Sequence, residues 1–230
     1  MPVLPGPPPV EIQMRRSARA KRFSLRVSRL DGKVTLTLPP RAKERDAMVF
    51  LSDQEGWLRN VLASMPQAKR HEVTHDTEIP VLGQMLRITP SEGRSIRVEG
   101  DQLLVPGHPD QAGAKIAAWL KALARDRLAA SSSHYADLVG RSYSRLVLRD
   151  TRSRWGSCSH DGTLMYSWRL AMAPRPVLDY VAAHEVAHLV EMNHSADFWA
   201  VVTRIRPGWK TERDWLKNQG QSLHRYAFTR

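Results

Sequence analysis

Residues 184–194 read "HEVAHLVEMNH" and contain three histidines and two glutamates in an otherwise largely apolar stretch. His184 and His188 are four positions apart, so on an α-helix their side chains lie on one face, one turn apart. Two imidazoles at this spacing can bind the same tetrahedral metal ion. Glu185 lies close enough to activate a water molecule on that ion. The stretch therefore predicts a helix that carries an H-E-x-x-H zinc site.

The residues around this motif predict that the helix is buried. Mainly small and apolar side chains precede it at residues 180–183, and others separate and follow its first two histidines. Two solvated histidines beside a solvated glutamate are the alternative interpretation of the motif. Buried histidines and carboxylates need partners, because removing them from water without one is costly. The apolar surroundings thus favour a metal site.

A catalytic zinc ion takes three protein ligands and keeps its fourth position for water. Glu191 and His194 are the two candidates for the third ligand. Glu191 lies on the same stripe as His184 but about 10.5 Å further along a straight helix, so one ion would bind both poorly. His194 becomes available if the helix ends near Met192 and the chain folds back.

We expect Asn193 to make this reversal, because asparagine tolerates the left-handed backbone conformation. His194 is then the better third ligand of the Zn²⁺ ion. Glu191 and Asp197 are candidates for orienting a ligating imidazole through a carboxylate.

The residues before the motif predict a β-hairpin. Asp161-Gly162 is a strong signal for a two-residue turn, and the returning strand is expected to end at Pro174. Three side chains of this region could stabilise the charge that develops on a substrate oxygen, or could be purely structural. They are Arg154, Tyr166 and Arg169.

Helical patterns recur in the second half of the chain, the motif helix included. The first covers residues 109–138 and is expected to stop at Gly140. The motif helix is expected over residues 175–192. Ser195 is a suitable N-cap for a helix over residues 196–205.

The whole chain predicts an α+β fold with a β-rich first half. Residues 1–19, rich in proline and then in arginine, are expected to form a flexible lead-in. Residues 20–107 are expected to form a β-rich region, with a hairpin turn at Asp31-Gly32 and a helix over residues 41–64. Residues 108–230 hold the motif and are expected to form the catalytic domain.

The composition limits the class of protein. The chain has 230 residues, of which 42% are hydrophobic and 25% charged, as in ordinary globular proteins. No run approaches the roughly 20 apolar residues of a membrane span, and the N-terminus lacks the pattern of a signal peptide. The single cysteine, Cys158, excludes an intramolecular disulfide and suits a reducing compartment. We therefore expect a soluble, cytoplasmic protein that does not bind membranes.

The net charge of +12 and the pI near 10.4 suit a polyanionic partner. The densest basic stretch, residues 14–29, has seven basic residues and no acidic one. From Phe23 onward it alternates like a half-buried strand with a cationic outer face. Nucleic acid is the candidate partner of this strand, and a merely solvated strand face is the alternative.

The region around the motif also resembles the YgjP-like metallopeptidase domain family. These are small bacterial proteins of the zincin type, distantly similar to SprT-like peptidases. The similarity is dense over residues 150–200 and weaker in the first half, where it includes "PVLG" at 80–83. It is carried by "RWGSC" (154–158), "WRL" (168–170), "YV" (180–181), "NHS" (193–195) and "FW" (198–199).

The resemblance implies a zincin-like catalytic domain in which His184, His188 and His194 bind zinc and Glu185 is the catalytic base. We therefore predict a zinc-dependent hydrolase, a metallopeptidase that cleaves peptides or proteins with a zinc-bound water. Two alternatives stay open. One is a metal-dependent hydrolase of nucleotide phosphoanhydrides. The other is a nucleic-acid-associated binding protein with a structural zinc, for which Cys158 is the candidate fourth ligand.

Overall fold

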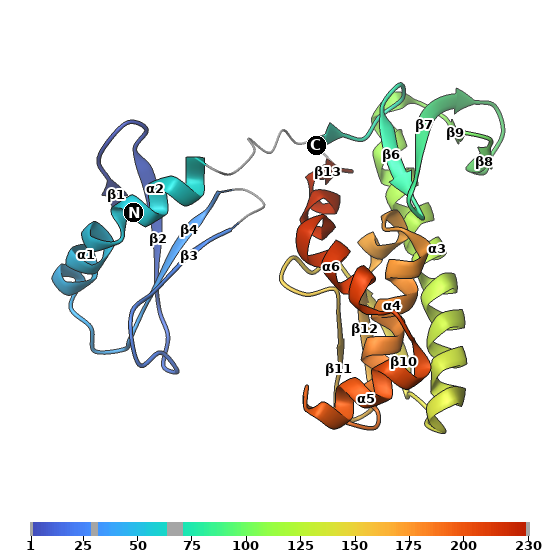
Figure 1. Cartoon of the computed structure of the whole chain (residues 1–230). Helices are drawn as coiled ribbons and strands as arrows, with labels where there is room; N and C mark the ends of the chain where they lie inside the picture. The colour runs from blue at the N-terminus through green and yellow to red at the C-terminus, as the bar shows by residue number, and fades with distance from the viewer. Residues whose placement is uncertain (1, 29–31, 64–70, 229–230) are drawn as a thin grey trace. The chain divides into compact units, whose positions relative to one another are not determined.

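The computed structural model of the chain describes residues 2–28, 32–63 and 71–228 (Figure 1). It separates into two compact units, Met1–Lys69 and Arg70–Arg230, called unit 1 and unit 2 below. Each unit has a hydrophobic core of its own.

The described residues of unit 1 form one sheet and two helices (Figure 1). Its elements are β1 (Val3–Leu4), β2 (Val10–Arg16), β3 (Ser24–Val27), β4 (Val34–Leu38), α1 (Glu44–Asp53) and α2 (Glu55–Ala63). The strand order is β1-β2-β4-β3, with β2 parallel and β3 antiparallel to β4. Alternate side chains of the strands, such as Ile12 and Leu36, are fully buried with Leu51 of α1. The opposite face of the sheet is polar.

The expectation of a flexible lead-in over residues 1–19 is wrong. Residues of this segment form β1 and β2 of the sheet, and Ile12 is fully buried there. Arg59 of α2 donates hydrogen bonds to the carbonyl oxygens of Pro5 at 2.7 Å and Pro8 at 3.1 Å. The prolines of this segment suggested that it would stay disordered. Burial of the alternating apolar side chains of β2 outweighs the conformational entropy that the segment loses when it is ordered.

Two further expectations fall in unit 1. The single helix over residues 41–64 is instead two helices, because α1 ends at its C-cap Gln54 and α2 begins directly after it. The Asp31-Gly32 turn lies partly outside the described residues, and β3 and β4 are antiparallel on either side of it.

Unit 2 begins with a second four-stranded sheet and a long helix. The sheet has the order β6-β7-β9-β8, and α3 follows it directly. Gly140 ends α3 in the left-handed conformation, with φ of 64°, which confirms the predicted helix stop. The elements are β5 (His71–Glu72), β6 (Glu78–Val81), β7 (Gln84–Ser91), β8 (Arg97–Glu99), β9 (Gln102–Pro106) and α3 (Pro109–Val139).

The remainder of unit 2 holds a three-stranded sheet and a group of shorter helices. Its elements are β10 (Arg145–Arg149), β11 (Gly156–Cys158), β12 (Thr163–Ser167), the 3-10 helix η1 (Trp168–Met172), α4 (Arg175–Ala187), α5 (Ala196–Ile205), α6 (Lys210–Asn218), the 3-10 helix η2 (Gly220–Arg225) and β13 (Tyr226–Ala227). The strand order is β10-β12-β11, so β11 is an edge strand. β11 and β12 form the predicted antiparallel hairpin around Asp161-Gly162. The returning strand ends at Ser167 and not at Pro174, because the chain turns into η1.

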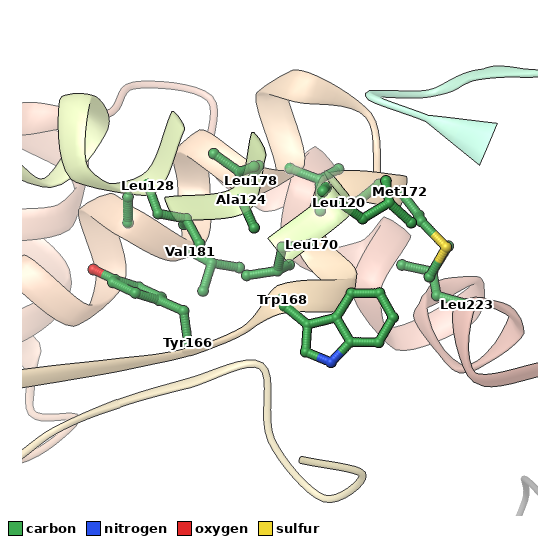
Figure 2. Close-up of a cluster of buried hydrophobic side chains, with 14 of the residues drawn as sticks. Leu120, Ala124, Leu128, Tyr166, Trp168, Leu170, Met172, Leu178, Val181 and Leu223 are labelled. Atoms are coloured by element: carbon green, nitrogen blue, oxygen red, sulfur yellow. The ribbon is translucent and has the colours of Figure 1, made fainter. Parts of the chain in front are cut away.

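One hydrophobic core joins the two halves of unit 2 (Figure 2). Leu120 and Leu128 of α3 pack with Tyr166 of β12, Leu170 of η1 and Val181 of α4, all of them buried. The expected domain boundary between residues 107 and 108 therefore falls inside unit 2. The long helix contributes its apolar side chains to a core shared by the first sheet and the motif helix, so it cannot separate two domains.

Among the described residues, no helix has the length and apolar character needed to cross a membrane.

Candidate metal centre

Helix α4 places His184 and Glu185 in its last turn, and His188 is its C-cap. The helix is shorter than predicted, because Leu189 and Val190 donate backbone hydrogen bonds to carbonyls only three residues back, at 2.9 and 3.0 Å. These tight bonds end the regular helix at Ala187 instead of Met192. The chain can therefore turn back earlier than the sequence suggested.

Asn193 helps the chain return, but not through a left-handed backbone, because its φ is not positive. Its side-chain oxygen accepts a hydrogen bond from the Ser195 backbone N–H at 3.0 Å. Ser195 in turn caps α5, since its hydroxyl accepts from the Phe198 N–H at 3.3 Å, as the sequence predicts. The two side-chain caps fix the turn and bring His194 to the end of α4.

The structure brings His184, His188 and His194 together. One ring nitrogen of each lies within 4.8 Å of the others. The Nε2 atoms of His184 and His194 are 3.1 Å apart. Two imidazole nitrogens at this distance must share a proton or a cation, since their lone pairs otherwise repel each other. The donor set therefore fits a divalent metal ion that binds imidazole.

Neighbouring groups orient these imidazoles. His188 donates its Nδ1–H to the backbone carbonyl of Glu191 at 2.9 Å, which leaves Nε2 free for a metal. The Tyr180 hydroxyl lies 3.4 Å from Nδ1 of His184. Phe198 is fully buried, and its ring centroid lies 4.9, 4.4 and 4.8 Å from those of His184, His188 and His194.

The environment keeps two of these histidines neutral. Burial, together with smaller effects of the nearby His188, His194 and Arg213, lowers the pKa of His184 to about 3. Burial also lowers the pKa of His188. Neutral imidazole is the form that binds a metal ion, so these two side chains need not lose a proton first.

Glu185 is buried beside the histidines, with 6% of its surface exposed. Burial raises the pKa of this carboxyl to about 8, against the opposing effects of the Arg154 charge and a hydrogen bond from the Cys158 backbone. The backbone of β11 approaches the carboxyl closely at Gly156. A Cβ atom at that position would lie 2.5 Å from Oε1 of Glu185. Glycine is therefore required where β11 passes the carboxylate.

These residues surround one pocket of about 200 Å³. One wall is the strand β11, and the other is the end of α4 with the loop that follows it. The lining residues are Arg154, Gly156, Ser157, Cys158, His184, Glu185, His188, Met192 and His194. The pocket thus combines three potential metal ligands, one buried carboxyl and one exposed guanidinium.

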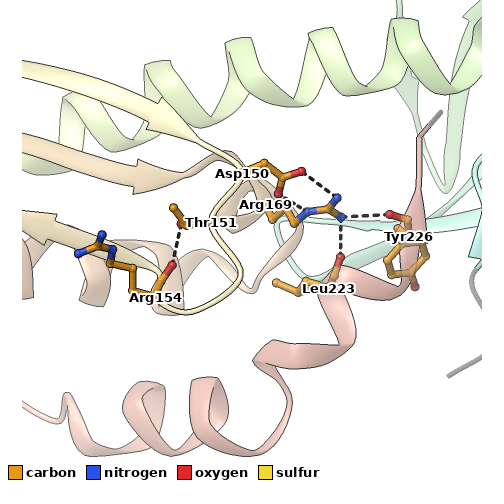
Figure 3. A network of polar contacts seen from close by, with 6 residues as sticks. All are labelled: Asp150, Thr151, Arg154, Arg169, Leu223 and Tyr226. Carbon is orange, nitrogen blue, oxygen red and sulfur yellow. Dashed lines mark hydrogen bonds and ion pairs between the residues drawn. The ribbon is translucent and has the colours of Figure 1, made fainter. Parts of the chain in front are cut away.

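Of the three predicted candidates for stabilising an oxyanion, Arg154 alone lines this pocket. Arg169 is held elsewhere (Figure 3). It binds both carboxylate oxygens of Asp150, at 2.7 and 3.1 Å, and the carbonyls of Leu223 and Tyr226, at 3.0 and 3.1 Å. Its guanidinium ties the end of the chain to the loop after β10. Arg169 was a candidate for stabilising an oxyanion, but these bonds give it a structural role instead.

Tyr166, the third candidate for stabilising an oxyanion, also has a structural role. Its ring is fully buried in the core and its hydroxyl lies 2.9 Å from that of Ser132 on α3. Glu191 contributes its backbone carbonyl to His188 and not its carboxylate. Asp197 is exposed in the first turn of α5, and among the described residues no hydrogen bond joins it to a histidine.

Gly156 is important to the site, although no catalytic motif in the sequence includes it. A glycine inside a predicted strand signals a close approach of another group, and this signal was present in "RWGSC". Phe198 is named in the sequence only as part of the "FW" pair that resembles the family. No sequence pattern shows that its ring would touch all three histidines.

The comparison with known families agrees with this geometry. The sequence profile described as "YgjP-like, metallopeptidase domain" matches residues 21–219. The chain belongs to the YgjP-like metallopeptidase domain family. Membership of this family supports a metal-dependent peptidase, and the three-histidine cluster provides residues that could hold its metal.

Two other comparisons add little. A solved structure, the crystal structure of the metallopeptidase zymogen of Pyrococcus abyssi abylysin, is similar at 24% sequence identity. The match covers 40% of this chain and 95% of that chain, with a TM-score of 0.36. No curated protein matches the chain.

Proposed function

We propose that this member of the YgjP-like family is a zinc-dependent peptidase whose reaction takes place in the pocket between β11 and α4. The observation that carries the proposal is the convergence of His184, His188 and His194 beside the buried Glu185 in one open pocket. Zinc is the preferred metal of three histidine ligands in hydrolytic sites.

The three histidines would hold the zinc ion. When bound, zinc supplies a Lewis acid that polarises the scissile carbonyl and increases the acidity of water. His188 is held in the right tautomer by the Glu191 carbonyl, and burial keeps His184 neutral. The chain therefore provides ligands that are already deprotonated and oriented.

Glu185 would act as the general base. Its carboxylate would take a proton from the attacking water and deliver it to the departing amine. Its surroundings support this role, because a carboxyl whose pKa is raised by burial is a stronger base than a solvated one. The packing of Gly156 and the Cys158 backbone against the carboxyl fixes its position.

β11 and Arg154 would bind the substrate. β11 is the edge of its sheet and lines the pocket, so an extended peptide can lie beside it. Arg154 is exposed at the same pocket and could stabilise negative charge on the carbonyl oxygen of the substrate. A peptide or protein is thus the substrate class that fits the pocket.

The two alternative functions are less well supported by this pocket. A phosphoanhydride hydrolase needs several cations around the metal, and Arg154 is the single arginine or lysine among the described residues that line the pocket. A structural zinc needs a fourth protein ligand. Cys158 is not part of the histidine cluster, and burial raises the pKa of its thiol to about 11.

The test uses the zinc-loaded full chain and its Glu185→Gln variant. We expect the wild type to cleave an unfolded protein and the variant to do so at least about 100-fold more slowly, which is the usual effect of losing a general base. Both should bind one zinc per chain by elemental analysis. Phosphate release from nucleoside triphosphates that is lost in the variant, without peptide cleavage, would replace the peptidase by a phosphoanhydride hydrolase.

A further inference from the structure

Unit 1 is more basic than unit 2. Residues 1–69 contain 13 lysines and arginines and 6 aspartates and glutamates, whereas residues 70–230 contain 22 and 17. The net charge of unit 1 is therefore +7 in 69 residues, against +5 in the 161 residues of unit 2. The metal centre does not use this charge, because all of its residues belong to unit 2.

Part of the charge lies on the face of the unit 1 sheet that points away from the core. Both helices of unit 1 pack on the apolar face, and within unit 1 no described helix covers the other. Along β2, β3 and β4 the uncovered face, called the open face below, consists of Glu11, Gln13, Arg15, Ser24, Arg26, Thr35 and Thr37. Glu11 is the one acidic residue within β2, β3 and β4, and it lies at the other end of β2 from Arg15.

The register of the strands places the two arginines of the open face apart. Arg15 lies opposite Thr37 of the central strand, and Arg26 lies opposite Thr35. The arginines are thus two strands and two residues apart, a Cα separation of about 12 Å from standard strand geometry. Both are exposed, and no ion pair joins either to a carboxylate among the described residues.

The loop between β2 and β3 adds three exposed cations at the end of the open face. They are Arg19, Lys21 and Arg22. Arg16 must be removed from the basic strand that the sequence suggested. Its guanidinium donates to the carbonyls of Pro40 at 3.0 Å and Ala42 at 2.7 Å, so it fastens the loop before α1.

We propose that the open face binds the sugar-phosphate backbone of double-stranded DNA, without reading the base sequence. Arginine, serine, threonine and glutamine are the side chains that contact phosphates in such complexes. The spacing of about 12 Å between Arg15 and Arg26 matches the width of the B-DNA major groove, so each can meet a different strand.

Other polyanions fit the open face less well. It carries no aromatic side chain on which single-stranded bases could stack. Its one large exposed apolar side chain among the described residues is Val3 of β1, opposite Glu11, because Val49 and Trp57 belong to the helices. A single valine is too little apolar surface for insertion into a bilayer. The major groove of duplex RNA is too narrow for the same contacts.

The experiment measures binding of a fluorescent DNA duplex of about 30 base pairs to the full chain by anisotropy, between 50 and 200 mM salt. Four or five phosphate contacts would give a slope near −4 in a plot of log affinity against log salt. The double variant Arg15→Ala/Arg26→Ala should bind at least about 10-fold more weakly and reduce the slope by about 2.

The matched control is Arg94→Ala/Arg141→Ala, which removes two exposed arginines of unit 2 and lowers the net charge equally. It should bind DNA within about twofold of the wild type. An equal loss in both variants would overturn the proposal, because net charge alone would then explain the binding. No binding at 50 mM salt, or tighter binding to duplex RNA, single-stranded DNA or vesicles with anionic lipids, would also overturn it. Circular dichroism of both variants checks that the fold is kept.

Discussion

The metal centre of unit 2 and the open face of unit 1 both gather polar side chains, under opposite physical conditions. At the metal centre, His188 and Glu185 are buried, so each needs a fixed partner and the packing of neighbours such as Phe198. On the open face, Arg15 and Arg26 stay in water and need no partner. A buried site therefore depends on each residue, whereas an exposed face acts through the sum of its charges, screened by salt.

Removal of a metal ligand should have the largest effect. We expect His188→Ala and His194→Ala to weaken zinc binding by more than about 100-fold. Mutating a residue that only hydrogen-bonds to a metal ligand already weakens metal binding by about 10–100-fold, and losing the ligand itself should cost more. Glu191→Ala is the matched control, because this residue offers its backbone carbonyl, which alanine retains. Competition with a chromophoric chelator measures the affinities. Equal losses in His194→Ala and Glu191→Ala would place the third ligand elsewhere.

Arg169→Ala should affect stability and leave the metal centre unchanged. Loss of the bidentate pair with Asp150 and of two bonds to carbonyls should cost about 3 kcal/mol in the free energy of unfolding. The exposed Arg127→Ala should change this free energy by less than about 0.5 kcal/mol. Urea unfolding gives both values. A loss of peptidase activity in folded Arg169→Ala, with unchanged zinc affinity, would return Arg169 to the mechanism.

Gly156→Ala should reduce peptidase activity by about 100-fold, because the new Cβ displaces a buried carboxyl that must be placed within about 1 Å. Zinc should remain bound. Gly56→Ala serves as the control, since a Cβ there meets nothing within 4 Å. Activity assays on an unfolded protein substrate compare the two. Full activity in Gly156→Ala would mean that the position of Glu185 is not held by β11.

Alkylation of Cys158 tests the polarity of the pocket wall. Burial raises the pKa of this thiol to about 11, with smaller contributions from the charges of Glu185 and Asp161. Below that pH the reactive thiolate is scarce, so iodoacetamide should react at pH 8 about 100-fold more slowly than with an ordinary exposed thiol. The rate should rise about 10-fold per pH unit. Rapid modification at pH 8 would show that the wall beside Glu185 is open to water.

The smallest effects are expected on the open face. Arg15→Ala and Arg26→Ala should each change the free energy of unfolding by less than about 0.5 kcal/mol, as exposed side chains without ion pairs usually do. Arg16→Ala should cost more, because its two bonds to carbonyls hold the loop before α1. Thermal unfolding of the three variants would detect the difference. An equal loss of unfolding free energy in all three variants would mean that the hydrogen bonds of Arg16 to the carbonyls do not stabilise the fold.

Much of unit 2 could be predicted locally. The helix ending at Gly140, the hairpin at Asp161-Gly162 and the capping of α5 by Ser195 depend on neighbouring residues in the sequence. Their physical causes, left-handed backbone at glycine and hydrogen bonds to free N–H groups, act within a few residues. Local patterns gave the wrong prediction for residues 1–19. The prolines there suggested a flexible segment, but β2 pairs with β4 in the sheet of unit 1.

The sequence by itself determined the chemistry of the candidate site: the spacing of His184 and His188 and the adjacent Glu185 follow from helix geometry alone. Only the tertiary structure decided how that chemistry is positioned. It ended α4 at Ala187, turned His194 back, brought Gly156 against Glu185 and assigned Arg169 to Asp150. The reason is that burial and long-range contacts depend on which segments share a core, and periodicity within one segment carries no information about its distant neighbours.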